Sequence, residues 1–217
     1  MSDQAVRPRL VLATTPLPDG PAGEEALRAA LSGGDVASVL IDPAGRDAAS
    51  YQLFAERLLP LAQAAGAAAI VVDDTRCAGR LQADGLHLTS GDVDELADAM
   101  KRFAPKLIVG ASGFSTRHDA LEAGERMPDY LMFGRLGGDT HREPYKKNLE
   151  LAAWWAELVE IPAIVLGGNA LETLDMAIAT GVEFIALATA VFADGIDPAE
   201  AVAKANAVLD RLADGAA

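Results

Sequence analysis

Small residues that follow two apolar segments near the carboxyl terminus have the composition of an anion-binding site. Gly167, Gly168 and Asn169 come directly after the apolar run AIVL, and Thr189 and Ala190 follow the run FIAL closely. Backbone amides in such turns can converge on a phosphate, because the glycines place no side chain in the way. A plain tight turn at the glycine pair is the alternative. We favour phosphate binding, because barrels recurrently build a phosphate site from these two turns.

Carboxylates after two earlier apolar segments have the composition of a magnesium site. Asp73 and Asp74 follow the run AAIVV, and Asp92 lies shortly after the run GLHL. Mg²⁺ typically takes one or two protein carboxylates and completes its shell with water and substrate phosphate oxygens. The pair Asp74 and Asp92 suits this ion. An equally supported alternative makes Asp92 a helix cap and Asp73 a turn residue.

Hydroxyl and imidazole groups complete the set of reactive side chains. Ser112 follows the segment IVGA and could donate a hydrogen bond to a phosphate oxygen or to a reacting ring, although a turn serine is the simpler interpretation. His87 lies within an apolar run and is expected to be structural. His141 is better placed than His118 to meet a substrate. No serine, histidine and carboxylate are arranged in a way that identifies a nucleophilic triad.

The order of apolar and helical segments predicts the elements that position these residues. Short runs rich in Val, Ile and Leu alternate with longer segments at helical spacing, the pattern of repeated β/α units. Near-continuous apolar strands imply burial on both faces, and right-handed crossovers would close eight units into a barrel. We therefore predict an α/β fold, a single (β/α)8 TIM barrel in one domain spanning residues 1–217. The predicted strands are 10–14, 36–41, 68–72, 85–88, 106–110, 130–133, 163–166 and 184–187, and the predicted helices are 23–31, 48–65, 77–82, 93–103, 116–125, 149–158, 170–179 and 198–212.

Helix caps and one long loop refine this prediction. Asp92, Ser115 and Asp197 are each placed to cap a following helix. The segment 135–148 follows the sixth predicted strand, carries glycines and many polar residues, and has neither helical nor strand periodicity. Long loops at the carboxyl ends of barrel strands usually cover the active site, and an ordinary mobile surface loop is the alternative.

Composition limits the partners and the compartment. The 217 residues include 32 acidic and 18 basic ones, and the net charge of −14 repels nucleic-acid phosphates and anionic lipid. Cys77 is the single cysteine, so no disulfide forms within the chain and a reducing compartment is the natural setting. No apolar run approaches the ~20 residues of a membrane helix, and the polar amino terminus carries no visible export signal. We expect a cytoplasmic protein with neither nucleic-acid nor membrane partners, and a homo-oligomer remains open.

Ordered motifs at the predicted strand ends carry a resemblance that runs through most of the chain from residue 68 onward. They are IVVDDTR (70–76), ADGLHL (83–88) with Asp92, IVGAS (108–112), DYLMFG (129–134), IPAIVLGG (161–168) and FIALATAV (184–191). With these motifs the chain resembles the thiamine phosphate synthase family, including its thiazole tautomerase relatives. The resemblance implies a magnesium-dependent transferase of thiamine biosynthesis. It would join an aminopyrimidine carried on a pyrophosphate to a thiazole phosphate, releasing pyrophosphate through a dissociative step.

The resemblance also implies site residues. Such a step requires the protein to neutralise charge on the leaving pyrophosphate and to hold the thiazole nitrogen in line with the bond that breaks. By the resemblance, Asp74 and Asp92 match the family's magnesium ligands. Ser112 matches its serine after the fifth strand, and Gly168 and Thr189 match its thiazole-phosphate contacts. Lys146 or its neighbour Lys147 matches the family's pyrophosphate-binding lysine, and the choice between them is open.

Positions around the second predicted strand depart from the family. Leu40, Asp42 and Ala44 stand where the family carries a glutamine, an arginine and a lysine for the pyrimidine and its pyrophosphate. An aspartate near a pyrophosphate repels it, whereas an arginine attracts it. Phe114 stands where the family, and the tautomerase branch especially, tends to have a histidine.

Two hypotheses of function follow from this comparison. The first is a thiamine phosphate synthase-like enzyme that binds a small phosphorylated substrate with Mg²⁺. The second is a divergent barrel that binds thiazole phosphate or another phosphorylated metabolite without forming the carbon–nitrogen bond. A phosphosugar isomerase or epimerase would need an acid/base pair, and the sequence identifies none.

Overall fold

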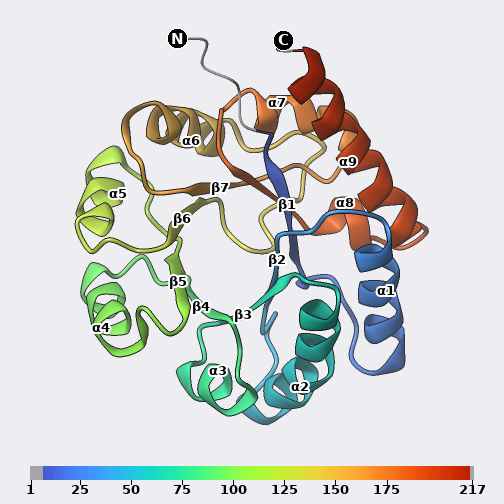
Figure 1. Cartoon of the computed structure of the whole chain (residues 1–217), viewed down its shortest axis with the longest axis horizontal. Coiled ribbons are helices and arrows are strands. Elements are labelled where there is room, and N and C mark those ends of the chain that lie inside the picture. Colours follow the sequence, from blue (N-terminus) through green and yellow to red (C-terminus); the bar gives the residue numbers. More distant parts are fainter. Residues whose placement is uncertain (1–6, 216–217) are drawn as a thin grey trace.

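Eight parallel strands close into a barrel with helices outside it, in the computed structural model that describes residues 7–215 (Figure 1). Each strand pairs with its neighbour in chain order, and the last pairs with the first. The predicted (β/α)8 barrel is therefore confirmed. The strands are β1 (Arg9–Ala13), β2 (Ser38–Ile41), β3 (Ala68–Val72), β4 (Gly85–Leu88), β5 (Ile108–Ala111), β6 (Tyr130–Phe133), β7 (Ala163–Leu166) and β8 (Phe184–Leu187).

Helices connect the strands and form the outer ring seen in Figure 1. A 3-10 turn, η1 (Leu171–Thr173), precedes α7. The helices are α1 (Pro21–Ser32), α2 (Ala48–Ala64), α3 (Thr75–Leu81), α4 (Val93–Phe103), α5 (Arg117–Gly124), α6 (Lys146–Leu158), α7 (Leu174–Ile178), α8 (Thr189–Phe192) and α9 (Pro198–Gly215). No helix in the described residues is long and apolar enough to cross a membrane.

Successive strand residues point to opposite faces of the sheet, so the barrel has one hydrophobic cluster outside the sheet and one inside it. The larger cluster lies between the strands and the helices and includes the fully buried Trp155. The smaller one fills the barrel interior and includes Leu40, Val72, Tyr130 and Met132. Interior packing of this kind makes the barrel a solid core, so a ligand site belongs at its rim.

Several predicted boundaries are wrong by a few residues. The second and fifth strands begin at Ser38 and Ile108, and α6 begins at Lys146, so the long loop ends at residue 145 instead of 148. The helix predicted at 170–179 starts at Leu171, because Ala170 is extended, and is divided into η1 and α7 at Thr173, whose backbone is not helical. The four-residue α8 is too short to produce a periodicity that the sequence could reveal.

Helix caps agree with the prediction at two of three places. Asp92 accepts hydrogen bonds from the amides of Asp94 and Glu95, and Asp197 caps α9 in the same way. The prediction of Ser115 as a cap is wrong. Thr116 takes the role, because its backbone is extended and its hydroxyl accepts from the amide of Asp119 at 3.2 Å.

Candidate functional site

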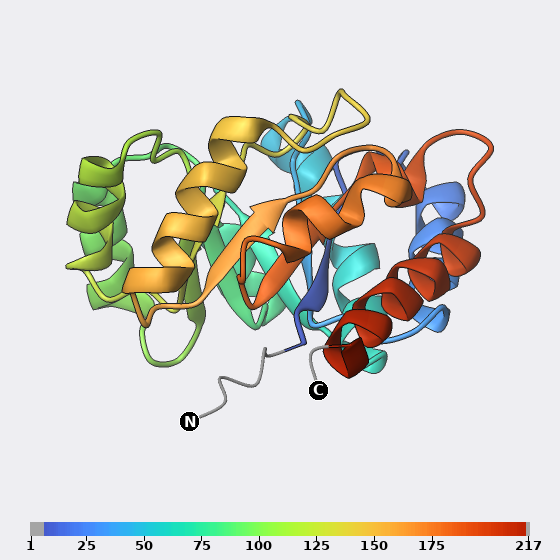
Figure 2. The same cartoon turned by 90° about the horizontal axis from the view of Figure 1, so that it is seen from above.

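The predicted site residues all lie at one end of the barrel, because each follows a parallel strand. This end lies along the upper edge of Figure 2, where the yellow segment before α6 rises above the strands. In chain order, the residues that follow β3 to β8 are Asp74, Asp92, Ser112, Lys146, Gly167 with Gly168, and Thr189 with Ala190.

The ends of β7 and β8 are covered by residues 134–145, which we call the β6–α6 loop. The amide of Thr189 donates to the Oδ2 atom of Asp139 at 2.6 Å, and the amide of Asn169 donates to the carbonyl of His141 at 2.9 Å. A Cβ atom at Gly168 would overlap the carbonyl oxygen of Arg142. Asp139, which is 5% exposed, therefore accepts the hydrogen bond of one of the amides predicted to bind phosphate.

The β6–α6 loop also reaches across the mouth of the barrel. Leu136 packs against the interior cluster, and a side chain at Gly137 would touch Thr15, which follows β1. Near its other end, the carbonyl of Arg142 accepts from the hydroxyl of Thr173 at 2.9 Å. The loop is thus attached on both sides of the mouth.

A cavity of about 410 Å³ lies between the β6–α6 loop, the start of α6 and the end of β7. His141, Lys146 and Gly167 are among its lining residues, and Lys147 is not. The Nζ atom of Lys146 lies 3.7 Å from Glu150, and its side chain is 88% exposed. Of the two candidate lysines, the one that faces this cavity is therefore Lys146.

The aspartates after β3 and β4 act as helix caps. The Oδ1 atom of Asp74 accepts from the amides of Arg76 and Cys77, and Asp92 caps α4 through its own Oδ1 atom. Asp73 joins the two strand ends, because its carboxylate accepts from both the amide and the hydroxyl of Thr89.

A magnesium ion fits these aspartates in donor chemistry. Within the described residues, each capping carboxylate makes its hydrogen bonds through Oδ1 alone, which leaves one oxygen of Asp74 and one of Asp92 for other ligands. The described part of the chain contains no cluster of three or more potential ligands. A site built from this pair would rely on substrate phosphate and water for the remaining ligands.

A buried polar chain lies inside the barrel below the β5 end. The Nε2 atom of His87 is 3.0 Å from the Oγ atom of Ser112, and its Nδ1 atom is 3.0 Å from the hydroxyl of Tyr130. Burial lowers the pKa of His87 to about 3, so the imidazole is neutral at physiological pH. His87 is fully buried, and it contacts Ser112, the serine predicted to meet substrate.

The positions that depart from the family lie at the end of β2. Leu40 belongs to the interior cluster. Asp42, 7% exposed, accepts hydrogen bonds from the Thr15 hydroxyl and the Ala44 amide, and the described residues place no cation within ion-pair distance of it. A buried carboxylate therefore lies at the end of β2, at the position where the resemblance implies an arginine.

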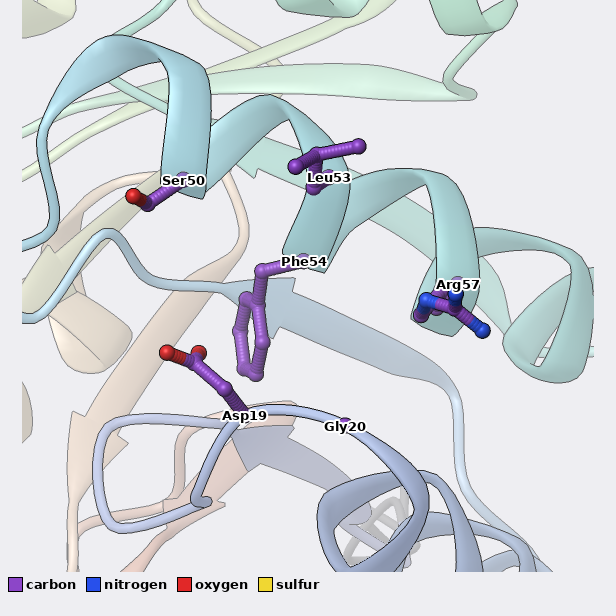
Figure 3. A pocket seen from close by; sticks show the side chains of 6 residues that line it. All are labelled: Asp19, Gly20, Ser50, Leu53, Phe54 and Arg57. Atoms are coloured by element: carbon purple, nitrogen blue, oxygen red, sulfur yellow. The ribbon is translucent and has the colours of Figure 1, made fainter.

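The nearest arginine after β2 is turned toward the outer ring. Arg46 donates to Asp19 at 2.6 Å, and its guanidinium carbon lies 3.7 Å from the centroid of the Phe54 ring. Figure 3 shows Asp19 and Phe54 facing each other beside a cavity of about 240 Å³, which Gly20 and Arg57 also line. None of the predicted site residues lines this cavity.

Sequence patterns alone do not single out Asp139, Tyr130 or Thr15. Asp139 lies in the loop already marked as functional, and an acid beside a glycine pair was the available signal. Tyr130 sits in an apolar run and looked like core. Thr15 shows its role only through its contact with Asp42, which follows the neighbouring strand β2.

A single (β/α)8 barrel with polar residues gathered at the carboxyl ends of its strands is the class that the fold and the site define. The sequence matches the family described as thiamine monophosphate synthase over residues 10–191. It is 34% identical to a thiamine-phosphate synthase of Rhodospirillum centenum, over 93% of this chain and 97% of that protein. It is 32% identical to a thiamine-phosphate synthase of Hyphomonas neptunium, over 95% of this chain and 96% of that one.

A solved structure agrees with these relatives. Thiamine phosphate pyrophosphorylase from Pyrococcus furiosus superposes with a TM-score of 0.75 and 26% identity, covering 96% of this chain and 98% of that one. The chain belongs to the thiamine monophosphate synthase family, which confirms the resemblance expected from its motifs.

Proposed function

We propose that this protein is a thiamine-phosphate synthase-like transferase of thiamine biosynthesis. The observation that carries the proposal is its family membership across nearly the whole length of synthase relatives, at 34% identity over 97% of one of them. Its substrates would be an aminopyrimidine pyrophosphate and a thiazole phosphate, with pyrophosphate as the leaving group. The whole chain, residues 1–217, would act as one domain in the cytoplasm, where a lone cysteine stays reduced.

The residues at the rim divide the work of this reaction. The thiazole nitrogen displaces pyrophosphate, so the protein must hold both substrates in line and neutralise the charge on the leaving group. Ser112 would donate a hydrogen bond at the reacting centre. Lys146 would lie against the pyrophosphate from the 410 Å³ cavity that it lines.

Asp74 and Asp92 would hold Mg²⁺ through the oxygen atoms that do not cap α3 and α4. The ion would supply positive charge to the pyrophosphate, for which one or two protein carboxylates suffice. Asp73 supports this arrangement, since its bonds to Thr89 tie the two strand ends together.

Gly167, Gly168, Thr189 and Ala190 would bind the thiazole phosphate through their backbone amides. Because Asp139 accepts the hydrogen bond of the Thr189 amide, phosphate binding requires this carboxylate to leave. The β6–α6 loop would thus open before the substrate enters and close over it afterwards.

A second candidate function is binding of a phosphorylated metabolite without bond formation. Asp42 and Leu40 favour it, since a buried acid and an apolar side chain replace contacts to the pyrimidine pyrophosphate. Calorimetry with each substrate separates the two functions. Tight binding of thiazole phosphate alone supports the second, and binding of both supports the first.

The direct test of synthase activity uses purified protein with both substrates and Mg²⁺. We expect thiamine phosphate and pyrophosphate in equal amounts, loss of product with a chelator, and recovery when Mg²⁺ is added back. Asp92→Asn keeps a cap acceptor but removes the charge, so it should lower activity, whereas Asp197→Asn at the cap of α9 should not. No product above background from the unmodified protein rejects the synthase proposal.

A further inference from the structure

We infer that Tyr130 and His87 are positioning residues that make the Ser112 hydroxyl a hydrogen-bond donor toward the barrel mouth. The inference deepens the proposed function, because Ser112 is the side chain proposed to meet the reacting centre. It rests on three side chains from adjacent strands that form one buried chain of hydrogen bonds.

Strand register explains how the chain is assembled. His87 on β4 is the register partner of Gly110 on β5, and Gly110 is the partner of Tyr130 on β6. Because Gly110 has no side chain, the Tyr130 ring covers it and reaches His87 from two strands away. A Cβ atom at Gly110 would overlap the tyrosine ring. The two rings lie nearly parallel, with centroids 5.6 Å apart and planes 6° apart.

Burial decides which atoms carry the protons. Tyr130 is 7% exposed, and its only hydrogen-bond partner in the described residues is the Nδ1 atom of His87. Burial raises the pKa of Tyr130, so the phenol keeps its proton and needs an acceptor. The acceptor is Nδ1, which must then be unprotonated.

The neutral imidazole therefore carries its single proton on Nε2. Nε2 donates to the Oγ atom of Ser112 at 3.0 Å. With Ser112 Oγ accepting from the imidazole, the serine proton remains for a third partner. Ser112 follows β5 two positions beyond the inward-facing Gly110, so strand alternation also turns it inward, one layer nearer the mouth. Ser112 is 2% exposed, and its proton has no acceptor among the described residues, so a ligand at the mouth would supply one.

The opposite tautomer would leave the free hydroxyl proton on Tyr130 instead of Ser112. In either tautomer one hydroxyl proton has no acceptor among the described residues: that of Ser112 if Nε2 is protonated, and that of Tyr130 if Nδ1 is protonated. A ligand at the mouth can accept from Ser112, whereas Tyr130 lies one layer deeper in the barrel. With a ligand bound, only the Tyr130 donor would remain unsatisfied, and an unsatisfied buried donor costs about 1–3 kcal/mol. Ser112 would then donate to Nε2 and have no proton left for a substrate.

The first test reads the tautomer directly and does not depend on catalysis. A His118→Asn, His141→Asn double variant leaves His87 as the one histidine, and its ring nitrogens can be followed in ¹⁵N-labelled protein by long-range ¹H–¹⁵N correlation. We expect a protonated Nε2 and an unprotonated Nδ1 at neutral pH. A proton on Nδ1 overturns the inference.

The second test asks whether the tautomer matters for the reaction. Tyr130→Phe removes the donor to Nδ1, and we expect kcat to fall about tenfold or more, a typical loss for one misplaced proton donor, with KM changed less than about twofold. In a Ser112→Ala background the same change should have no further effect. A full additional loss in that background, or an unchanged kcat in Tyr130→Phe, contradicts the inference.

The two tests also separate this inference from the proposed function. If the unmodified protein makes no thiamine phosphate, the synthase proposal fails, and the nitrogen spectra still decide whether Ser112 is held as a donor. Because Tyr130→Phe is isosteric apart from its hydroxyl, a thermal melt of the variant shows whether the fold is retained. The Ser112→Thr variant keeps a hydroxyl and should recover part of the activity lost in Ser112→Ala.

Discussion

The two sides of the barrel mouth differ in which residues hold their polar groups in place. On the β4–β6 side, Ser112 is held from below by His87 and Tyr130, which are buried inside the barrel. On the β7–β8 side, the Thr189 amide is held from above by Asp139, a side chain of the β6–α6 loop. One side therefore has its polar groups fixed by the core, and the other has them covered by a loop that lies outside the sheet.

Replacing one glycine by alanine on each side of the mouth should give the largest difference in the free energy of unfolding between the two sides. Gly110→Ala would push against the Tyr130 ring inside a packed core, and we expect the free energy of unfolding to fall by about 3 kcal/mol, as overpacking does. Gly168→Ala meets the backbone of Arg142 and Glu143, so the loop must move as a unit; stability should fall less than in Gly110→Ala, because this loop lies outside the sheet. Chemical denaturation and amide exchange in residues 139–143 measure both effects.

A matched control for these two variants is Gly79→Ala in α3. Nothing lies within 4 Å of an added Cβ at Gly79, so a helical alanine should stabilise the protein by roughly 0.5–1 kcal/mol. Equal losses in Gly110→Ala and Gly168→Ala would remove the distinction between the two sides.

Lowering the pH should lower the free energy of unfolding through His87, on the β4–β6 side. Its pKa is about 3 in the folded protein and about 6.5 in the unfolded chain, so only the unfolded chain takes up this proton as pH falls between those values. Stability from this group is complete above pH ~6.5 and falls by up to about 1.4 kcal/mol per pH unit below it. Urea denaturation at pH 7, 6 and 5 tests this, with His87→Gln expected to show a flatter dependence and His118→Asn an unchanged one.

Removing the charge of Asp139 should strengthen phosphate binding on the β7–β8 side. Asp139→Asn replaces a charge-assisted hydrogen bond to the Thr189 amide by a weaker neutral one, a difference of about 1.4 kcal/mol or tenfold in affinity. Calorimetry with thiazole phosphate and with inorganic phosphate measures it. Glu143→Gln removes the same charge from an exposed position in the same loop and should change affinity less than twofold. Weaker binding by Asp139→Asn would show that the carboxylate assists the ligand instead of competing with it.

The smallest expected effect concerns the two lysines at the start of α6. Lys146 lines the cavity beside the loop and Lys147 does not, so Lys146→Gln should raise the KM for the aminopyrimidine pyrophosphate several-fold and Lys147→Gln should not. The exposed ion pair of Lys146 with Glu150 contributes less than ~0.5 kcal/mol, so both variants should melt with the unmodified protein. The opposite order of KM values would assign the pyrophosphate contact to Lys147.

Local patterns were sufficient for the barrel and for much of its rim. Eight apolar runs alternating with helical segments defined the strands, since burial on both faces leaves a mark in every strand. They also placed Asp74, Asp92 and Ser112 at the same end, because parallel strands share their direction. Boundaries were less accurate where a backbone turn, such as the extended Ala170, decides the start of a helix.

What the sequence by itself determined is the closed barrel, the family and the end of the barrel at which the predicted site residues gather. Only the tertiary structure decided that Asp139 takes the Thr189 amide and that Tyr130 reaches His87 over Gly110. Both contacts depend on strand register and loop path, which join residues far apart in the chain. No local period encodes such pairings, because they arise when the whole sheet closes and its loops pack onto one another.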